Sequence, residues 1–212
     1  MITLYSYFRS SSSYRVRIAL HLKGIEHQII PIDLRKDEHK TPAFQALNPQ
    51  QNLPVLVDGD LTLSQSLVII NYLDQKYPSP SLLPEDKKLF WKGRELALFI
   101  ACEMHPLNNL RVLKYLTGPL QLTEDQKKTW YFHWLKEGFD VLEKELACYD
   151  APYALCAQPT LVDLCLIPQM YNARRFGFDL TLYPRLCAIE ASCLALDAFQ
   201  KAAPEAQIDC DI

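Results

Sequence analysis

Four consecutive serines follow a short β-prone run near the N-terminus and lead into a helical pattern, in the segment YSYFRSSSSYR at 5–15. The backbone N–H groups and positive dipole end of a helix start favour a bound anion, and a thiolate carried by a ligand would be stabilised as well as a phosphate. A helix cap needs only one serine, so the run favours an anion site over a plain cap. The turn has no glycine and no Gly-Lys-Ser/Thr, which excludes a P-loop.

Pro54 begins a short apolar run at 54–57. Proline at the start of a strand is ordinary, so a purely structural role is one interpretation. A cis bond between Leu53 and Pro54 is the sharper one, because it would expose the backbone N–H and C=O of Leu53 to a peptide-like ligand.

Ser64, Gln65 and Ser66 lie where a predicted strand ends and a predicted helix starts. The helix start offers N–H donors, and the Gln65 side chain stands beside a serine, which would suit the carboxylate of a small ligand. A plain serine cap at Ser64 or Ser66 fits the spacing equally well.

A polar cluster surrounds Pro106, which predicts a kink or break in the helix just before it. His105 and Asn109 are four residues apart, and Asn108 and Arg111 are three apart, so each pair could share a helical face. A lone histidine is more often structural than ligand-binding, so these residues alone favour a structural role.

Arg174 and Arg175 lie near the end of a predicted helix, where cations are favoured by the helix dipole. Arginine also binds carboxylates in bidentate fashion, which matters if the substrate is a diacid. Thr160 and Asp163 precede an apolar helix with the spacing of a capping box, so we interpret them as structural.

The elements that must position these residues change character near residue 80. Before it, a β-α-β pattern is followed by a connector and a β-β-α pattern. In the second strand Pro31 predicts a place near a sheet edge, and the Asp-Gly at 58–59 predicts a hairpin turn. After the proline-rich stretch at 78–86, long helical patterns dominate. The expected strands are 2–5, 27–32, 54–57 and 61–63, and the expected helices are 13–23, a short one within 33–48, 65–76, 87–116, 123–148, 160–175 and 184–200.

The composition is that of a globular protein with one large or two small domains: 212 residues, 49% apolar, 22% charged and net charge −3. A pI near 6.0 gives no general attraction to nucleic acid or anionic membrane. No apolar segment has the length of a signal-peptide core or a membrane span. Seven cysteines without a CxxC pair support neither a zinc site nor a dithiol redox centre, and they predict a reduced, cytoplasmic protein.

Taken together, the motifs resemble the glutathione transferase superfamily, and most closely its zeta class, which includes maleylacetoacetate isomerase. The resemblance covers essentially the whole chain. It implies an α/β thioredoxin-like N-terminal domain at 1–79 that binds glutathione, a linker at 80–86 and an all-α, substrate-binding C-terminal domain at 87–212. Five collinear blocks carry it: YSYFRSSSSYRVRIALHLKGI at 5–25, FQALNPQQNLPVL at 44–56, SQSLVIINYL at 64–73, HPLNNLRVLKYL at 105–116 and PTLVDLCLIPQMYNARRFGFDLTLYP at 159–184.

One residue departs from the zeta pattern of two serines followed by a cysteine, because Ser12 stands at the cysteine position. The departure argues against a mechanism that needs a protein nucleophile there. It leaves the Ser10–Ser11 pair intact. The first 101 residues contain no cysteine, so the resemblance implies that the reactive sulfur comes from glutathione.

Carried over by position, the resemblance implies that Ser10 faces the glutathione sulfur and that Ser11 and Arg15 support the turn. His39 corresponds loosely to a glutathione contact in the connector. The backbone of Leu53 would pair with the cysteinyl part of the tripeptide.

The remaining glutathione contacts implied by the resemblance come from both domains. Gln65 and Ser66 would hold the carboxylate and amine of the γ-glutamyl group. His105 and Asn109 would close the site from the second domain.

The resemblance implies a cis–trans isomerisation of maleylacetoacetate to fumarylacetoacetate in tyrosine and phenylalanine catabolism, by reversible addition of the glutathione thiolate. Arg175 matches the family's arginine near the acidic substrate, and Arg9 and Arg111 are added on electrostatic grounds. A homodimer is expected. The alternatives are maleylpyruvate isomerisation, conjugation or dehalogenation of small α-halo acids, and a non-catalytic glutathione-binding adaptor.

Overall fold

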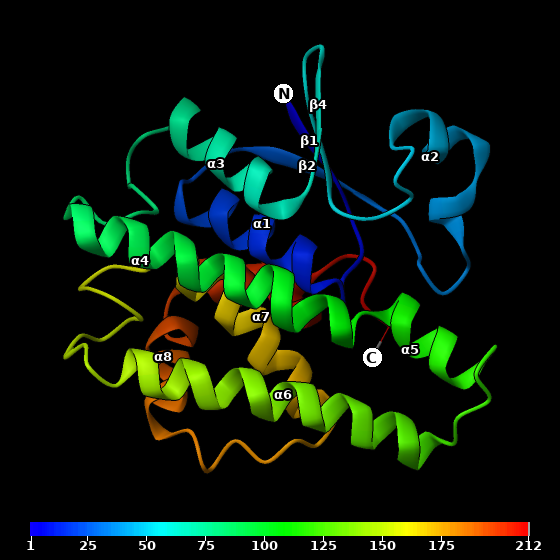
Figure 1. Cartoon of the computed structure of the whole chain (residues 1–212). Helices are drawn as coiled ribbons and strands as arrows, with labels where there is room; N and C mark the ends of the chain where they lie inside the picture. Colours follow the sequence, from blue (N-terminus) through cyan, green and yellow to red (C-terminus); the bar gives the residue numbers. More distant parts are fainter. Residues whose placement is uncertain (212) are drawn as a thin grey trace. The chain divides into compact units, whose positions relative to one another are not determined.

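The computed structural model describes residues 1–211, and its contacts divide the chain into two compact units. The N-terminal unit comprises Met1–Leu82 together with Leu194–Ile212, and the helical unit comprises Leu83–Cys193 (Figure 1). The expected fold class is confirmed: an α/β unit with a four-stranded sheet is combined with a unit built from helices.

The sheet of the N-terminal unit has the strand order β2-β1-β3-β4. β1 (Ile2–Ser6) pairs in parallel with β2 (His27–Pro31), so a crossover helix must connect them, whereas β3 (Val55–Asp58) is antiparallel to both β1 and β4 (Leu61–Ser64). Gly59, with φ of +61°, turns the hairpin between β3 and β4 as the Asp-Gly pair predicted. Pro31 does lie in an edge strand.

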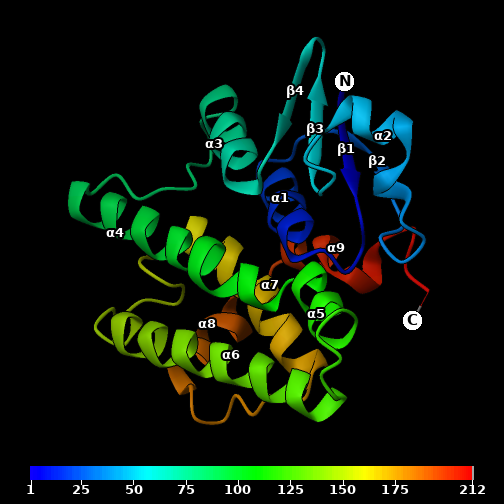
Figure 2. The same cartoon turned by 45° about the vertical axis from the view of Figure 1, so that its right-hand side comes forward.

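Helices cover both faces of this sheet, with α1 and α3 on one side and α2 on the other (Figure 2). The core between the sheet and α1 is apolar and fully buried at Leu4, Ile18 and Leu56. Gly24, with φ of +61°, follows the end of α1 and provides the stop expected there. The helices of this unit are α1 (Ser11–Leu22), a 3-10 helix (Glu38–Lys40), α2 (Pro42–Leu47), α3 (Ser66–Lys76), α9 (Asp197–Ala202) and a second 3-10 helix (Pro204–Ala206).

The C-terminal segment differs from the sequence prediction, which assigned all of 87–212 to the second domain. Residues 194–211 belong by their contacts to the N-terminal unit, where α9 packs against α1. Phe199 and Ala202 are fully buried, and the Tyr14 hydroxyl donates to the Phe199 carbonyl at 3.4 Å. Helical periodicity identifies the apolar face of a short helix but not the neighbour that covers it, which is why the boundary was misplaced.

The helical unit is organised around α7 (Leu161–Arg175), which packs against α4 and lies between α4 and α6 in both views (Figures 1 and 2). Every residue from 161 to 170 is buried, as expected of a helix enclosed on all sides. The other helices are α4 (Lys87–Leu98), α5 (Leu110–Thr117), α6 (Glu124–Leu146) and α8 (Pro184–Leu194).

The single helix expected at 87–116 is divided. After α4 the chain forms a π-helical stretch (Phe99–Met104) and a 3-10 helix (His105–Asn108) before α5 begins. The break falls where Pro106 predicted it, because proline cannot donate the helical hydrogen bond. Within residues 1–211, no helix is both long and apolar enough to cross a membrane.

Candidate active site

The serine run lies at the junction of β1 and α1. Ser10 is the N-cap of α1, and its Oγ accepts the Ser13 N–H at 3.2 Å. The Ser10 N–H donates to the Tyr7 carbonyl at 2.9 Å, which tightens the turn. Ser11 is buried and begins the helix. One serine therefore does serve as the cap, and the first turn of α1 contains no acidic residue that would occupy its donors.

Arg15 connects this helix start to the start of α3. Its guanidinium is buried, with 2% of the residue exposed, and Nη1 donates to the Ser66 hydroxyl at 3.3 Å. Nε and Nη2 of Arg15 are also buried and have no hydrogen-bond partner within residues 1–211. A buried cation with unused donors is costly unless an anion completes it, so this position fits a ligand carboxylate.

Gln65 precedes α3 with a left-handed backbone, φ +72°. This conformation is unfavourable for a non-glycine residue, and such strain is found most often at functional sites. The Gln65 side-chain amide donates to Oε1 of Gln50 at 2.7 Å. Gln50 was not predicted as a site residue. It lies in the segment FQALNPQQNLPVL at 44–56, but no spacing rule connects it to Gln65.

The peptide bond between Leu53 and Pro54 is cis, as the sharper interpretation of this motif required. That the Leu53 backbone meets a peptide-like ligand stays a prediction. Leu53 is buried in an apolar cluster with Tyr7, Phe8, Phe44 and Val55. The cluster joins the segment before β3 to the turn that carries the serines, so these motifs belong to one locality of the N-terminal unit.

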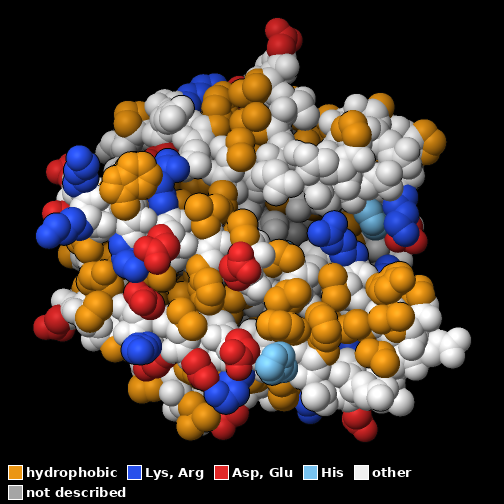
Figure 3. Space-filling model, in the orientation of Figure 1, with side chains coloured by type: hydrophobic (Ala, Val, Ile, Leu, Met, Phe, Trp, Pro, Cys, Tyr) orange, Lys and Arg blue, Asp and Glu red, His pale blue; other side chains and the backbone are white. Residues whose placement is uncertain are grey.

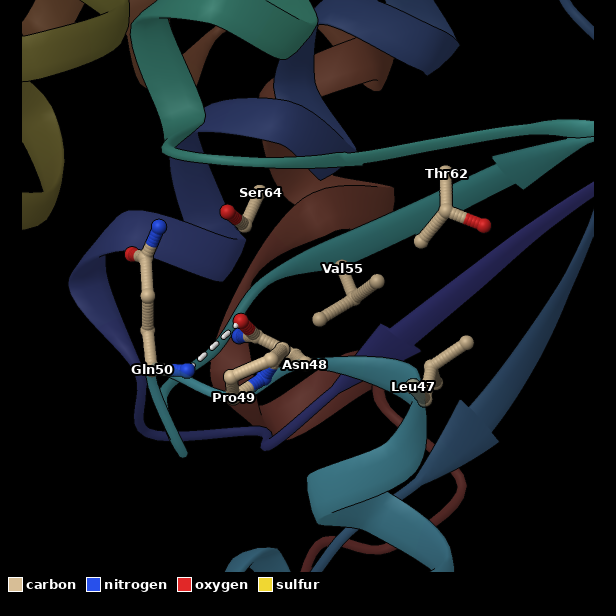
Figure 4. A pocket seen from close by; sticks show the side chains of 7 residues that line it. All are labelled: Leu47, Asn48, Pro49, Gln50, Val55, Thr62 and Ser64. Carbon is tan, nitrogen blue, oxygen red and sulfur yellow. Dashed lines mark hydrogen bonds between the residues drawn. The ribbon is translucent and has the colours of Figure 1, made fainter.

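A recess of about 310 Å³ opens beside these motifs (Figure 4). Gln50 and Ser64 lie on its wall, and the Gln50 N–H donates to the Asn48 side chain at 3.0 Å. Ser64, on the wall of the recess, directly precedes Gln65 in the chain. The recess offers polar groups to a ligand bound there. Its lining comprises Leu47, Asn48, Pro49, Gln50, Val55, Thr62 and Ser64.

Arg9 and His39 are two further predicted site residues of this unit. Arg9 directly precedes Ser10, and its guanidinium lies 4.9 Å from the centre of the Phe8 ring. His39 lies in the first 3-10 helix with Nε2 4.0 Å from the Asp37 carboxylate. The direct contacts described for the serine and glutamine motifs do not include His39, so its role stays a prediction.

The predicted residues of the helical unit include one directly contacting pair. The Asn109 amide nitrogen lies 3.3 Å from His105 Nε2, and Asn109 caps α5 by accepting the Arg111 N–H at 3.1 Å. The prediction that Asn108 and Arg111 share a helical face is wrong, because Asn109 is the N-cap of α5 and separates the two residues. Asn108 is buried and donates to the Tyr131 carbonyl at 3.1 Å.

The two arginines at the end of α7 have different surroundings. Arg174 forms an ion pair with Glu190, with Nε 3.0 Å from Oε2. Arg175 lies over the ring of Phe176 at 4.5 Å, and that ring stacks on Tyr131 at 4.0 Å. Burial raises the pKa of Tyr131 above its usual value, and the positive charge of Arg175 opposes this.

The structure thus groups Ser10, Ser11, Arg15, Leu53, Gln65 and Ser66 in the N-terminal unit, and His105, Asn109, Arg111 and Arg175 in the helical unit. That His105 and Asn109 close the glutathione site stays a prediction. The capping box at Thr160 and Asp163 is present and structural, as expected. The described residues contain no group of three or more His, Cys, Asp or Glu side chains that could hold a metal ion.

Comparison with known proteins identifies the family. The family model "Glutathione S-transferase, N-terminal domain" matches residues 1–75. The chain is 46% identical to a probable maleylacetoacetate isomerase of Vibrio cholerae, over 98% of each chain. It also resembles the holo structure of a bacterial maleylpyruvate isomerase, described as a zeta-class glutathione transferase, with TM-score 0.96, 44% identity and coverage of 99% of this chain and 100% of that one.

A third relative has glutathione in its active site. It is a maleylacetoacetate isomerase of Anaeromyxobacter dehalogenans, similar to this chain with TM-score 0.89 and 36% identity over 100% of this chain and 98% of that one. These similarities extend over nearly the full length and confirm the resemblance inferred from the motifs. The chain belongs to the zeta class of the glutathione transferase family.

Proposed function

We propose that the protein is a glutathione-dependent cis–trans isomerase that converts maleylacetoacetate to fumarylacetoacetate. The observation that carries the proposal is the pair of helix starts, α1 capped by Ser10 and α3 beginning at Ser66, joined by the buried Arg15. The relatives' names support this reaction. Maleylpyruvate is the second candidate substrate, because a maleylpyruvate isomerase is among the most similar structures.

Glutathione fits the N-terminal unit. The unused donors of Arg15 suit a carboxylate, the Ser66 hydroxyl accepts from the same guanidinium, and Gln65 directly precedes Ser66. We assign the γ-glutamyl group to these residues, the cysteinyl backbone to Leu53 and the thiol to Ser10 and Ser11. His39 and Gln50 are assigned to the remaining part of the tripeptide.

Bound glutathione supplies a thiolate that adds reversibly to the conjugated double bond, which can then rotate. Ser10 has the geometry to assist, since a hydroxyl that accepts the Ser13 N–H still has its own proton to donate. A donated hydrogen bond and the start of α1 both lower the pKa of a thiol placed there. Arg9 adds a positive charge beside this position.

We assign the substrate carboxylates to the arginines Arg9, Arg111 and Arg175. Arg174 is already paired with Glu190, so Arg175 is the stronger candidate of the two at the end of α7. The stack of Phe176 and Tyr131 would hold its guanidinium in a defined position. In this proposal the N-terminal unit binds glutathione and the helical unit binds the acid.

We also propose a cytoplasmic homodimer that acts in tyrosine and phenylalanine catabolism. All seven cysteines are free thiols, which supports a reducing compartment. Hydrophobic side chains are exposed along α4 and α5, as in Trp91, Leu98 and Tyr115, and Figure 3 shows such side chains gathered over these helices. Exposed apolar patches of this kind mark protein interfaces. Light scattering after size-exclusion chromatography tests the dimer.

The decisive experiment measures isomerisation of maleylacetoacetate and of maleylpyruvate, each with and without glutathione. We expect activity only with glutathione, and the ratio of the two kcat/KM values identifies the substrate. Binding to immobilised glutathione without turnover would support an adaptor, and halide release from α-halo acids without isomerisation would support a dehalogenase. Full activity without glutathione would overturn the proposal.

A matched variant tests whether a protein thiol takes part. The C-terminal segment brings one cysteine, Cys210, to the N-terminal unit, where it packs against the apolar cluster of Tyr7 and Phe8. We expect Cys210→Ala to keep wild-type turnover, because the sulfur in this proposal comes from glutathione. Loss of turnover with an unchanged unfolding midpoint would assign a chemical role to Cys210.

A further inference from the structure

The turn between β1 and α1 is held by hydrogen bonds to both the N–H and the carbonyl of one residue, Phe8. The Phe8 N–H donates to a carboxylate oxygen of Asp209 at 3.0 Å. The Phe8 carbonyl accepts from Nη2 of Arg17 at 3.0 Å. Phe8 stands two residues before Ser10, so both bonds restrain the segment that carries Arg9 and Ser10.

Arg17 extends this restraint along the turn. The residue is fully buried, and its Nη1 donates to the Ser6 hydroxyl at 3.0 Å and to the Tyr7 carbonyl at 3.4 Å. Its Nε donates to the Ala202 carbonyl at the end of α9, at 2.8 Å. One planar guanidinium therefore joins the end of β1 and the first two residues of the turn to the C-terminal segment.

The C-terminal segment is anchored at a second point beside the same turn. Asp211 pairs with Arg35 at 2.7 Å. The Arg35 guanidinium lies 5.8 Å from the ring of Tyr7 and 5.7 Å from that of Phe8. Asp209 thus lies between two attachment points, Ala202 and Asp211, which limits how far its carboxylate can move from the Phe8 N–H.

We propose that Arg17 and Asp209 are positioning residues that clamp the Tyr7–Ser10 turn between them and so set the places of Arg9 and the Ser10 hydroxyl. The inference rests on the proposed function, since it concerns the turn assigned there to the glutathione thiol. It gives the last residues of the chain a part in catalysis, although none of them contacts the reacting atoms in this assignment.

Asp209 offers the sharper test, because substitution of the fully buried Arg17 could prevent folding. Asp209→Ala removes the acceptor, whereas Asp209→Asn keeps an oxygen that can accept the same N–H. Asp197→Ala is the matched control, because it removes an exposed carboxylate from the same segment. Unfolding midpoints of all four proteins separate loss of fold from loss of position.

The readouts are kcat, KM for glutathione and the pKa of the bound thiol, followed by thiolate absorption. We expect Asp209→Ala to lower kcat by up to about 10²-fold, as for a catalytic group displaced by an ångström, with a much smaller change in KM. The pKa of the thiol should rise as Ser10 loses its position. Loss of the negative charge alone would lower that pKa, so the sign separates positioning from electrostatics. Asp209→Asn should keep kcat near wild type, with a thiol pKa that is unchanged or slightly lowered by the lost charge, and Asp197→Ala should resemble wild type in all readouts.

Amide hydrogen exchange gives a readout that does not depend on turnover. The Phe8 N–H should be protected in the wild type and in Asp209→Asn, and should exchange faster in Asp209→Ala. Unchanged protection, or an Asp209→Ala variant with wild-type kcat and thiol pKa, would overturn the clamp. A wild-type protein without glutathione-dependent turnover would instead overturn the proposed function, so the two failures are distinguishable.

Discussion

The starts of α1 and α7 are built from similar residues, but their hydrogen-bonding groups are used differently. At α7 the buried Asp163 carboxylate accepts the Thr160 N–H at 2.7 Å, the Thr160 hydroxyl at 2.9 Å and the Ala154 N–H at 2.8 Å. At α1 Ser10 accepts one N–H, from Ser13, and no acidic side chain stands in the first turn. The α7 start is completed by its own chain, whereas the α1 start suits an external anion.

The difference teaches that a hydroxyl at a helix start indicates a ligand site only when no internal carboxylate occupies the same donors. We call the starts of α1 and α3 open, because no acidic side chain stands in their first turns, and the start of α7 closed, because Asp163 stands there. Arg15 strengthens the contrast, because it brings a buried cation to the open start of α3. The predictions test whether the open starts serve binding and catalysis while the closed start serves stability.

The largest effect is expected for Ser10→Ala. Removing one hydrogen-bond donor to a developing charge lowers turnover by roughly 10²–10³-fold. Loss of the cap should lower the free energy of unfolding by only about 1 kcal/mol. Steady-state kinetics and urea titration measure the two effects. Ser12→Ala is the control in the same serine run and should stay near wild type. Wild-type activity of Ser10→Ala would remove Ser10 from the mechanism.

The opposite balance is expected for Asp163→Ala. The change leaves buried donors of Thr160 and Ala154 without their acceptor, which should lower the free energy of unfolding by about 3 kcal/mol. KM for glutathione should not change in the protein that remains folded. Asp125→Ala, at the exposed start of α6, is the matched control for a lost carboxylate. A stable variant with a raised KM would contradict the division between open and closed starts.

Arg15→Met tests the link between α1 and α3. Without the guanidinium, KM for glutathione should rise by roughly 10- to 100-fold, the effect of losing hydrogen bonds between charged groups. We expect kcat to change less, because this residue is assigned to the γ-glutamyl end rather than to the sulfur. Arg15→Lys should recover part of the affinity. Unaltered glutathione binding in both variants would show that the unused donors of Arg15 serve another purpose.

The smallest effect concerns the far end of α1, where burial and the neighbouring His27 lower the pKa of His21 from 6.5 to about 4. The unfolded chain then takes up this proton at higher pH than the folded one. Stability from neutral His21 is therefore complete above pH 6.5 and is lost as the pH falls toward about 4. Burial raises the pKa of Asp163, so the stability that this group contributes at the start of α7 depends on pH in the opposite sense. Urea midpoints across this range should fall less in His21→Gln than in wild type.

Several helix starts and breaks were predictable because their signals are local. Ser10 and Ser66 follow strand patterns and precede helical ones, and the capping box at Thr160 and Asp163 has a fixed spacing. The break at Pro106 follows from proline's missing donor. The prediction that Asn108 and Arg111 share a helical face was wrong, because helical periodicity does not show that a new helix starts at Asn109.

The sequence by itself determined the order of the strands and main helices of residues 1–76, the starts of α1, α3 and α7 and the family, because caps, proline effects and periodicity act within a few residues of the chain. Only the tertiary structure decided that Arg15 contacts Ser66, that Gln50 accepts from Gln65 and that Asp209 accepts from Phe8, 201 residues away. Such contacts depend on which buried surfaces pack together, and local spacing has no relation to that choice.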